Sequence, residues 1–205
     1  MAARGRPAST VRGAPTKSSD GRIEFNLAPG TAGGRRRRGA KAALRSGSIG
    51  FPFLDSIAPT VFSIVDRESR RATGLAAFMR IEPTHRVIEV GSILFTNALQ
   101  RTRGATEAMY LMARYVFEEL EYRRYEWKCN ALNAASRRAA LRLGFGFEGV
   151  FRQHMIVKGR SRDTAWYSMI DAEWPARKAA FERWLSPDNF HPDSRQKTPL
   201  TIVST

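Results

Sequence analysis

The sequence predicts an α/β fold in which a mixed, mostly antiparallel sheet is flanked by helices. Three observations support this prediction. Several short segments alternate apolar and polar residues, a later segment repeats its apolar residues with the helical period of about 3.6, and a compact strand–helix–strand unit follows. At 205 residues the chain is long enough for one domain with a buried core, with tails at its ends.

The first three expected strands cover residues 61–65, 74–81 and 87–95. Polar turns separate them, and short connections of this kind join antiparallel neighbours, so we expect a meander. Apolar residues then recur on one helical face from Ala105 to Leu120, which predicts a helix. A further strand is expected over residues 124–129.

The segment from Asn130 to Arg152 carries the most specific local signals. Asn133 is a good N-cap because its side-chain oxygen accepts from the first N–H groups of a helix, and Gly144 is suited to ending that helix. Strands at 146–157 and 164–170 follow. Asp171 is expected to cap a last helix, and residues 186–205 are expected to form a flexible tail.

This segment resembles the second half of the GNAT acyl-CoA N-acyltransferase superfamily, in particular the branch that acetylates the N-termini of ribosomal proteins. That branch has Asn-x-x-Ser, a short helix, Leu-Gly-Phe and then Glu-Gly. Here the matching residues are Asn133, Ser136, Leu143-Gly144-Phe145 and Glu148-Gly149. The resemblance implies an acyltransferase domain at residues 56–185, with the sheet splayed between the strands at 87–95 and 124–129 to admit acetyl-CoA.

The resemblance further implies an enzyme that moves an acetyl group from acetyl-CoA, its co-substrate, to a primary amine by direct attack. The acceptor is either a protein N-terminus or a small-molecule amine. Cys129 lacks an evident His partner, which gives no ground for a covalent enzyme intermediate. The three His residues have no metal-ligand spacing, so no metal is expected.

The loop before the long helix is the first candidate site, because a helix N-terminus suits a pyrophosphate. The family pattern, Gln/Arg-x-x-Gly-x-Gly/Ala, fits here in two alignments, one starting at Gln100 and one at Arg101. An ordinary strand–helix loop is the alternative. The candidate CoA-binding residues of this loop are Gln100, Arg101, Arg103, Gly104, Ala105 and Thr106.

Asn133 and Ser136 are the second candidate site. The resemblance implies that Asn133 contacts the pantetheine arm of CoA and that the Ser136 hydroxyl lies near its sulfur. A nearby O–H group stabilises or protonates a leaving thiolate, whose conjugate acid has a pKa of roughly 8.5. Helix capping alone is the alternative explanation for both residues.

Glu89 is the third candidate, as a catalytic base. Alternation places it on the same strand face as Val87, Gly91 and Ile93, and a carboxylate among apolar neighbours is typical of a base with a raised pKa. We expect it to remove a proton from the acceptor ammonium through water. The run around Glu89 resembles Glu-Ile-Gly-Tyr of the same branch. A Glu on an exposed face is the alternative.

The start of the chain is strongly basic. Residues 1–50 carry a net charge of +9, out of +15 for the chain. Their composition predicts disorder over residues 1–55, and this includes Ile23–Leu27, which alternates like a strand but is isolated. A transit peptide, an arm for nucleic acid or the ribosome, and a wrongly assigned start all explain this segment.

Family members normally begin with a strand and two helices that wall the acceptor site, and these are expected to be missing or replaced here. The alternative function is therefore a non-catalytic CoA-fold binding module with a basic arm, limited to residues 1–50, for nucleic acid or the ribosome. The single Cys129 and the lack of an apolar run of about 20 residues favour a cytoplasmic protein without membrane contact.

Overall fold

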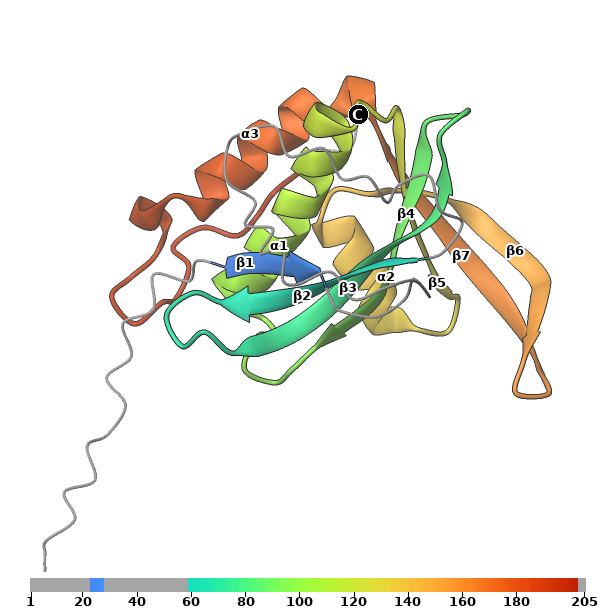
Figure 1. Cartoon of the computed structure of the whole chain (residues 1–205), viewed down its shortest axis with the longest axis horizontal. Helices are drawn as coiled ribbons and strands as arrows, with labels where there is room; N and C mark the ends of the chain where they lie inside the picture. The colour runs from blue at the N-terminus through green and yellow to red at the C-terminus, as the bar shows by residue number, and fades with distance from the viewer. Residues whose placement is uncertain (1–22, 28–58, 203–205) are drawn as a thin grey trace, which may run out of the picture.

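The computed structural model describes residues 23–27 and 59–202. Within them one sheet has the strand order β1-β2-β3-β4-β5-β7-β6 (Figure 1). Only the β4–β5 pair is parallel, which confirms the predicted mixed, mostly antiparallel sheet. The strands are β1 (Ile23–Leu27), β2 (Thr60–Asp66), β3 (Ala72–Glu82), β4 (Val87–Phe95), β5 (Arg124–Asn130), β6 (Gly146–Val157) and β7 (Arg160–Ile170).

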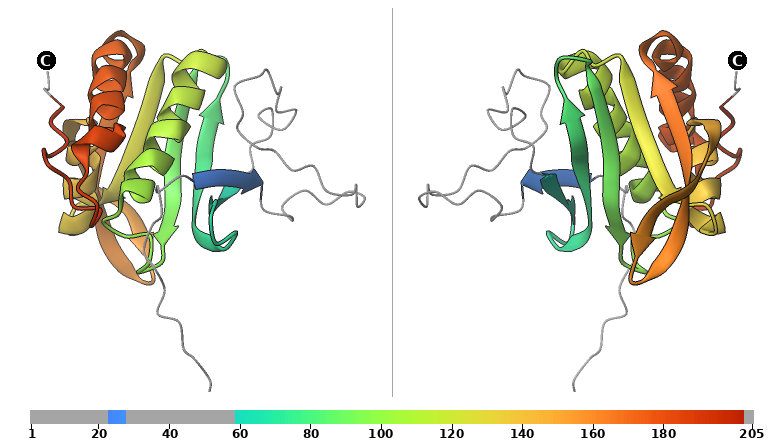
Figure 2. Two further views of the ribbon diagram at one scale, coloured as in Figure 1. Left: turned by 90° about the vertical axis from the view of Figure 1, so that its left-hand side faces the viewer. Right: turned by 90° about the vertical axis from the view of Figure 1, so that its right-hand side faces the viewer.

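The helices pack on one face of the sheet, as Figure 2 shows most clearly for α1 and α3. The α-helices are α1 (Arg103–Arg114), α2 (Ala134–Arg142) and α3 (Trp174–Leu185). A π-helical turn, Tyr115–Glu119, continues α1, so the helix predicted from residue 105 to residue 120 changes its winding in its last third. No helix within the described residues has both the length and the apolar character needed to span a membrane.

The hydrophobic core lies between this sheet face and the helices. From β5, Tyr125 and Trp127 point into it, and the Phe145 ring lies 5.3 Å from the Tyr125 ring and 5.6 Å from the Trp127 ring. Phe117 approaches Tyr125 edge-on at 6.2 Å from the π-helical turn. Alternation therefore sends the intervening residues of β5 to the opposite face, away from the helices.

The sheet opens between its two central strands. The parallel pairing of β4 with β5 runs only from Val87 opposite Arg124 to Val90 opposite Trp127. Beyond these pairs β4 continues to Phe95 along β3, and β5 continues to Asn130 along β7. A β-bulge at Ser92, whose φ is +50°, bends β4 just past the last shared pair. The expected splay is confirmed.

The N-terminal expectation needs a correction. Ile23–Leu27 is not disordered: it forms β1 and pairs with β2 along its whole length, from Ile23 opposite Asp66 to Leu27 opposite Phe62. The first strand of the family fold is therefore present. Local composition missed it because its partner lies far along the chain. Residues 1–22 and 28–58, which include the Arg run at 35–38, lie outside the described residues, and so does the expectation that the two helices are missing or replaced.

The expectation of a flexible tail over residues 186–205 is wrong as far as Ile202. The Asn189 side chain donates to the Trp184 carbonyl at 3.0 Å and accepts from the Thr198 N–H at 3.0 Å. Ile202 then lies against the turn at Gly144. One buried amide thus fixes a segment whose composition is polar, and residues 203–205 lie outside the described part.

Candidate active site

The loop before α1 is built around Thr102. Its hydroxyl accepts from the Ala105 N–H at 3.2 Å and donates to the Leu99 carbonyl at 2.7 Å, so Thr102 is the N-cap of α1. Arg101, with a φ of +61°, holds the left-handed conformation that turns the chain into the helix. Because the first N–H groups of a helix have no partner within it, this end of α1 suits an anion.

Two side chains of this loop form hydrogen bonds with carbonyl groups of other segments. Gln100 donates through Nε2 to the Phe95 carbonyl at 2.8 Å. Arg103 donates through Nη2 to the Leu185 carbonyl at 2.6 Å, and its guanidinium carbon lies 5.0 Å from the Phe190 ring centroid. The structure thus gives the Arg103 side chain a role in holding the end of α3, and the loop's candidate contribution to CoA binding rests on backbone amides.

A cation that the sequence reasoning missed lies beside the first turn of α1. Arg142, from the last turn of α2, donates through Nη1 to Oγ1 of buried Thr106 at 3.0 Å. Its guanidinium lies 5.1 Å from the centroid of the Trp184 ring, and desolvation lowers the pKa of Arg142. A basic residue in the last turn of the capped helix was the only sequence signal for it.

Asn133 and Ser136 both lie at the start of α2. The Asn133 side chain accepts from the Ser136 N–H at 3.0 Å, which is the capping bond that the sequence predicted. The Ser136 hydroxyl accepts from Nε1 of Trp127 at 3.0 Å. Because an indole N–H only donates, the Ser136 proton remains available for a second hydrogen bond. The buried Trp127 ring therefore orients the Ser136 hydroxyl.

Glu89 occupies the predicted strand face, away from the helices, but its surroundings are not apolar. It is 3% exposed, pairs with Arg80 of β3, and lies 3.1 Å from the Lys128 ammonium of β5. The expectation of a carboxylate isolated among apolar groups is wrong. Alternation fixed the face of Glu89, whereas its charged partners come from neighbouring strands that the sequence alone did not place.

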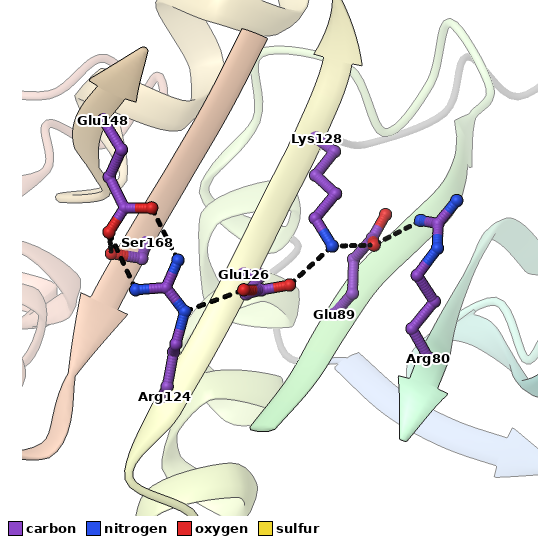
Figure 3. A network of polar contacts seen from close by, with 7 residues as sticks. All are labelled: Arg80, Glu89, Arg124, Glu126, Lys128, Glu148 and Ser168. Atoms are coloured by element: carbon purple, nitrogen blue, oxygen red, sulfur yellow. Dashed lines mark hydrogen bonds and ion pairs between the residues drawn. The ribbon is translucent and has the colours of Figure 1, made fainter. Parts of the chain in front are cut away.

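Figure 3 shows that these contacts continue across the sheet as a row of alternating charges, here called the charge ladder. Lys128 lies 2.6 Å from Glu126, and Arg124 donates to Glu126 at 2.7 Å. Arg124 also binds both carboxylate oxygens of Glu148, which accepts from Ser168 at 2.6 Å. In order, the charge ladder consists of Arg80, Glu89, Lys128, Glu126, Arg124, Glu148 and Ser168.

The outer end of the charge ladder shifts two pKa values in opposite directions. Hydrogen bonds from Arg124 hold the pKa of Glu148 below its ordinary value, and donating these bonds to Glu148 raises the pKa of Arg124. Both groups are thus held in their charged forms. The sequence did contain a signal: Arg124, Glu126 and Lys128 alternate with the apolar residues Tyr125, Trp127 and Cys129 along β5.

Lys128 lies at the opening of the sheet. It is the first β5 residue beyond the last β4–β5 pair, and its side chain is 7% exposed. Besides Glu89 and Glu126, its ammonium faces the ring of Trp166 at 3.9 Å from the centroid, and Phe151 stacks on that ring at 4.4 Å. A primary amine is thus held between two carboxylates and an aromatic face.

Comparison with known proteins decides the family. The model of the acetyltransferase (GNAT) domain matches residues 37–146, more than half of the chain. The chain belongs to the GNAT acetyltransferase family. The family resemblance predicted from the sequence is confirmed. The opening between β4 and β5 therefore belongs to the GNAT domain of this chain. Within the described residues, no group of His, Cys, Asp or Glu has the arrangement of a metal site.

Relatives agree with this assignment. The crystal structure of a GCN5-related N-acetyltransferase from Brucella melitensis is 53% identical, with a TM-score of 0.68, over 69% of this chain and 64% of that one. The ribosomal-protein-serine acetyltransferase of Escherichia coli (strain K12) is 30% identical over 47% of this chain and 54% of its own length. The GNAT chain described here thus spans under two thirds of each relative.

Proposed function

We propose that the protein transfers an acetyl group from acetyl-CoA to a primary amine by direct attack. The observation that carries this proposal is the opening between β4 and β5, which has Glu89 on one sheet face and Ser136 on the other. A thioester in the opening would lie between a group that accepts a proton and a group that donates one. Acetyl transfer requires both, because the acceptor ammonium must lose a proton before it attacks and the leaving thiolate must be stabilised.

The residues present fit acetyl-CoA. Amides of residues 101–106 at the start of α1 would hold the pyrophosphate, apart from the Thr102 and Ala105 N–H groups, which already donate to the Leu99 carbonyl and the Thr102 hydroxyl. Arg142 adds positive charge nearby. Past Val90, β4 and β5 have no backbone pairing with each other within the described residues. Their facing backbone groups are therefore suited to pairing with the pantetheine amides. The bulge at Ser92 turns the backbone of β4 at this point, where a donor to the thioester oxygen is needed.

Each catalytic candidate has one task. Glu89 accepts the proton of the acceptor ammonium, directly or through water, and its ion pairs with Arg80 and Lys128 hold the carboxylate in place. Ser136 donates its hydroxyl to the CoA sulfur as the carbon–sulfur bond breaks. Asn133 keeps α2, and with it Ser136, in place through the cap, and its exposed position suits contact with the pantetheine arm.

The acceptor amine belongs to a protein N-terminus or to a small molecule. The relative named ribosomal-protein-serine acetyltransferase supports testing a peptide with an N-terminal Ser first. A small primary amine is the second acceptor to test. Contact with nucleic acid or the ribosome is a separate proposal for residues 1–50, supported by their net charge of +9.

Release of CoA thiol in the presence of acetyl-CoA and each amine tests the proposal, with Ser136→Ala as the decisive variant. We expect kcat to fall about 10- to 100-fold while acetyl-CoA affinity stays near that of the wild type, because the hydroxyl acts when the thiolate leaves. Ser161→Ala, at an exposed position of β7, is the matched control. An unchanged kcat, with chemistry shown to limit the rate, would leave Ser136 with helix capping alone.

Calorimetry separates binding from turnover. Acetyl-CoA should bind more tightly than acetyl-pantetheine, which lacks the pyrophosphate that the amides of residues 101–106 would hold. Equal affinities would remove that part of the site. Tight binding of acetyl-CoA without thiol release for any amine would instead favour the non-catalytic binding module.

A further inference from the structure

The amine nearest to the candidate base is one of the protein's own. The Lys128 ammonium lies 3.1 Å from Glu89 and 2.6 Å from Glu126, and Lys128 is the first β5 residue past the last pair with β4. A free acceptor would have to bring its ammonium to the same place: within hydrogen-bond reach of Glu89 and beside the opening. Lys128 therefore occupies, with its own side chain, the position that the chemistry assigns to an acceptor amine.

We propose that Lys128 is a self-acetylation site, modified by acetyl-CoA bound to the same chain. This inference rests on the proposed function, because it uses the same opening and the same base. Its consequence is that the protein has an internal acceptor, which competes with external amines for the acetyl group.

Lys128 differs from the other lysines of the described residues in its surroundings. Its side chain is 7% exposed and is aligned by two carboxylates and by the face of Trp166. Lys178 pairs instead with Glu118, at 2.8 Å on the helix side of the molecule. Lys158 and Lys197 are exposed, at the β6–β7 turn and in the C-terminal segment. These three lysines thus serve as internal controls for chemical acetylation.

The reaction balances without a further reactant. Glu89 takes one proton from the Lys128 ammonium, and the neutral nitrogen attacks the thioester carbonyl of acetyl-CoA. The new carbon–nitrogen bond forms, the carbon–sulfur bond breaks, and the sulfur leaves with the electron pair of that bond. Ser136 donates a hydrogen bond to the thiolate, and the second ammonium proton is released as the amide forms. One of the two protons ends on the sulfur and the other goes to solvent, which returns Glu89 to its carboxylate form. The products are acetyl-Lys128, CoA thiol and one proton.

Acetylation would divide the charge ladder. The amide nitrogen of acetyl-Lys128 is neutral, so Glu89 would keep Arg80 and Glu126 would keep Arg124 as charged partners, with no cation between the two carboxylates. The acetyl group would also remain at the opening. We therefore expect the modified protein to acetylate external amines more slowly than the unmodified one.

Peptide-resolved mass spectrometry of the full chain, incubated with acetyl-CoA and no acceptor, tests the inference. Lys128 should gain one acetyl group faster than Lys158 and Lys197, although it is the least exposed of the three. Ser136→Ala should slow the modification of Lys128 by about tenfold or more and leave Lys158 and Lys197 unchanged. A good external acceptor should protect Lys128 in the wild-type protein.

Lys128→Arg keeps the positive charge but offers no primary amine, so this variant should show no acetylation at position 128 and unchanged background at Lys158 and Lys197. Circular dichroism checks that it folds. An unmodified Lys128, or equal modification in wild type and Ser136→Ala, would overturn the inference. Thiol release with external amines, followed in the same samples, separates the two ideas: turnover without acetyl-Lys128 overturns self-acetylation alone, and absence of both overturns the proposed function too.

Discussion

The two faces of β5 hold the sheet together in different ways. On the helix face, Tyr125 and Trp127 pack against Phe145 and lie in the hydrophobic core. On the opposite face, Glu126 pairs with both Arg124 and Lys128 of its own strand, while Lys128 also pairs with Glu89 of β4 and Arg124 with Glu148 of β6. Both sets are largely buried, and both come from one run of seven residues, so alternation alone assigned one face to apolar contact and the other to charge.

The two faces contribute differently: the apolar face mainly stabilises the fold, whereas the charged face mainly positions side chains. Burial of apolar area stabilises the fold in proportion to the area, with little demand on direction. Buried ion pairs lose hydration, and their mutual attraction offsets the free energy of that loss only when the geometry is good. They therefore add little net stability. A buried charged row on the face that carries the candidate base is therefore best explained by the positions that it imposes on Glu89 and Lys128.

The largest expected effect comes from breaking the helix face. Phe145→Ala removes a ring that is in contact with both Tyr125 and Trp127, and the free energy of unfolding should fall by about 3–5 kcal/mol. Urea denaturation measures this change. Leu132→Ala, at a side chain that is 90% exposed, is the control and should stay within about 0.5 kcal/mol of the wild type. A loss below about 1 kcal/mol for Phe145→Ala would show that the core closes around the gap.

Breaking the charged face should cost somewhat less. Lys128→Met leaves Glu89 and Glu126 without their shared cation, although each keeps one Arg, and we expect a loss of about 2–3 kcal/mol in unfolding free energy. Adding Glu126→Gln to that variant should recover part of the loss, because one uncompensated carboxylate disappears. Additive losses in the double variant would mean that Glu126 and Lys128 do not act on one another.

The outer end of the charge ladder predicts a pH dependence. Because Arg124 lowers the pKa of Glu148 in the folded protein, this carboxylate contributes stability above its unfolded pKa of about 4.3. That contribution is lost as the pH falls through the lower, folded pKa. Melting temperatures from about pH 6 to about pH 3 should therefore fall more steeply for the wild type than for Glu148→Gln. Since Glu148 is 40% exposed, the difference should be small and should shrink with added salt. Parallel curves would contradict the shift.

The smallest effect is expected from one hydroxyl on the helix face. The Tyr125 hydroxyl is buried without a hydrogen-bond partner among the described residues, and burial raises the pKa of Tyr125. Tyr125→Phe should change the unfolding free energy by less than about 1 kcal/mol, in the stabilising direction. Tyr110→Phe, which loses a bond to Glu182 of 2.9 Å, should be destabilising by about 1 kcal/mol. A clear destabilisation by Tyr125→Phe would indicate that this hydroxyl has a partner in solution, such as a buried water.

Local signals in the sequence predicted most of the fold. The bounds of β4 and β6 match the predicted residues, because alternation and flanking turn residues define both ends. Asn133 and Gly144 likewise defined α2. What local signals missed depends on distant contacts. β1 exists through its pairing with β2, and the segment after α3 is fixed by Asn189.

The candidate site was predicted in part for the same reason. Asn133, Ser136 and the α1 loop follow from local patterns, and the structure gives each the position at a helix start that those patterns predict. The partners of Glu89 do not, because Arg80 and Lys128 reach it only through the pairing of β4 with both β3 and β5. Strand alternation predicts which side chains share a face, and sheet topology then decides which of them meet.

The charge ladder also bears on how this protein can change over evolutionary time. Each inner carboxylate shares its cations, so the effect of replacing one residue depends on its neighbours. A lineage that loses Lys128 alone retains two close carboxylates, whereas one that first replaces Glu126 meets a different cost for the second step. Substitutions at Glu89, Glu126 and Lys128 should therefore accumulate as linked sets in a preferred order, while Ile156 of β6, which is 80% exposed, varies independently.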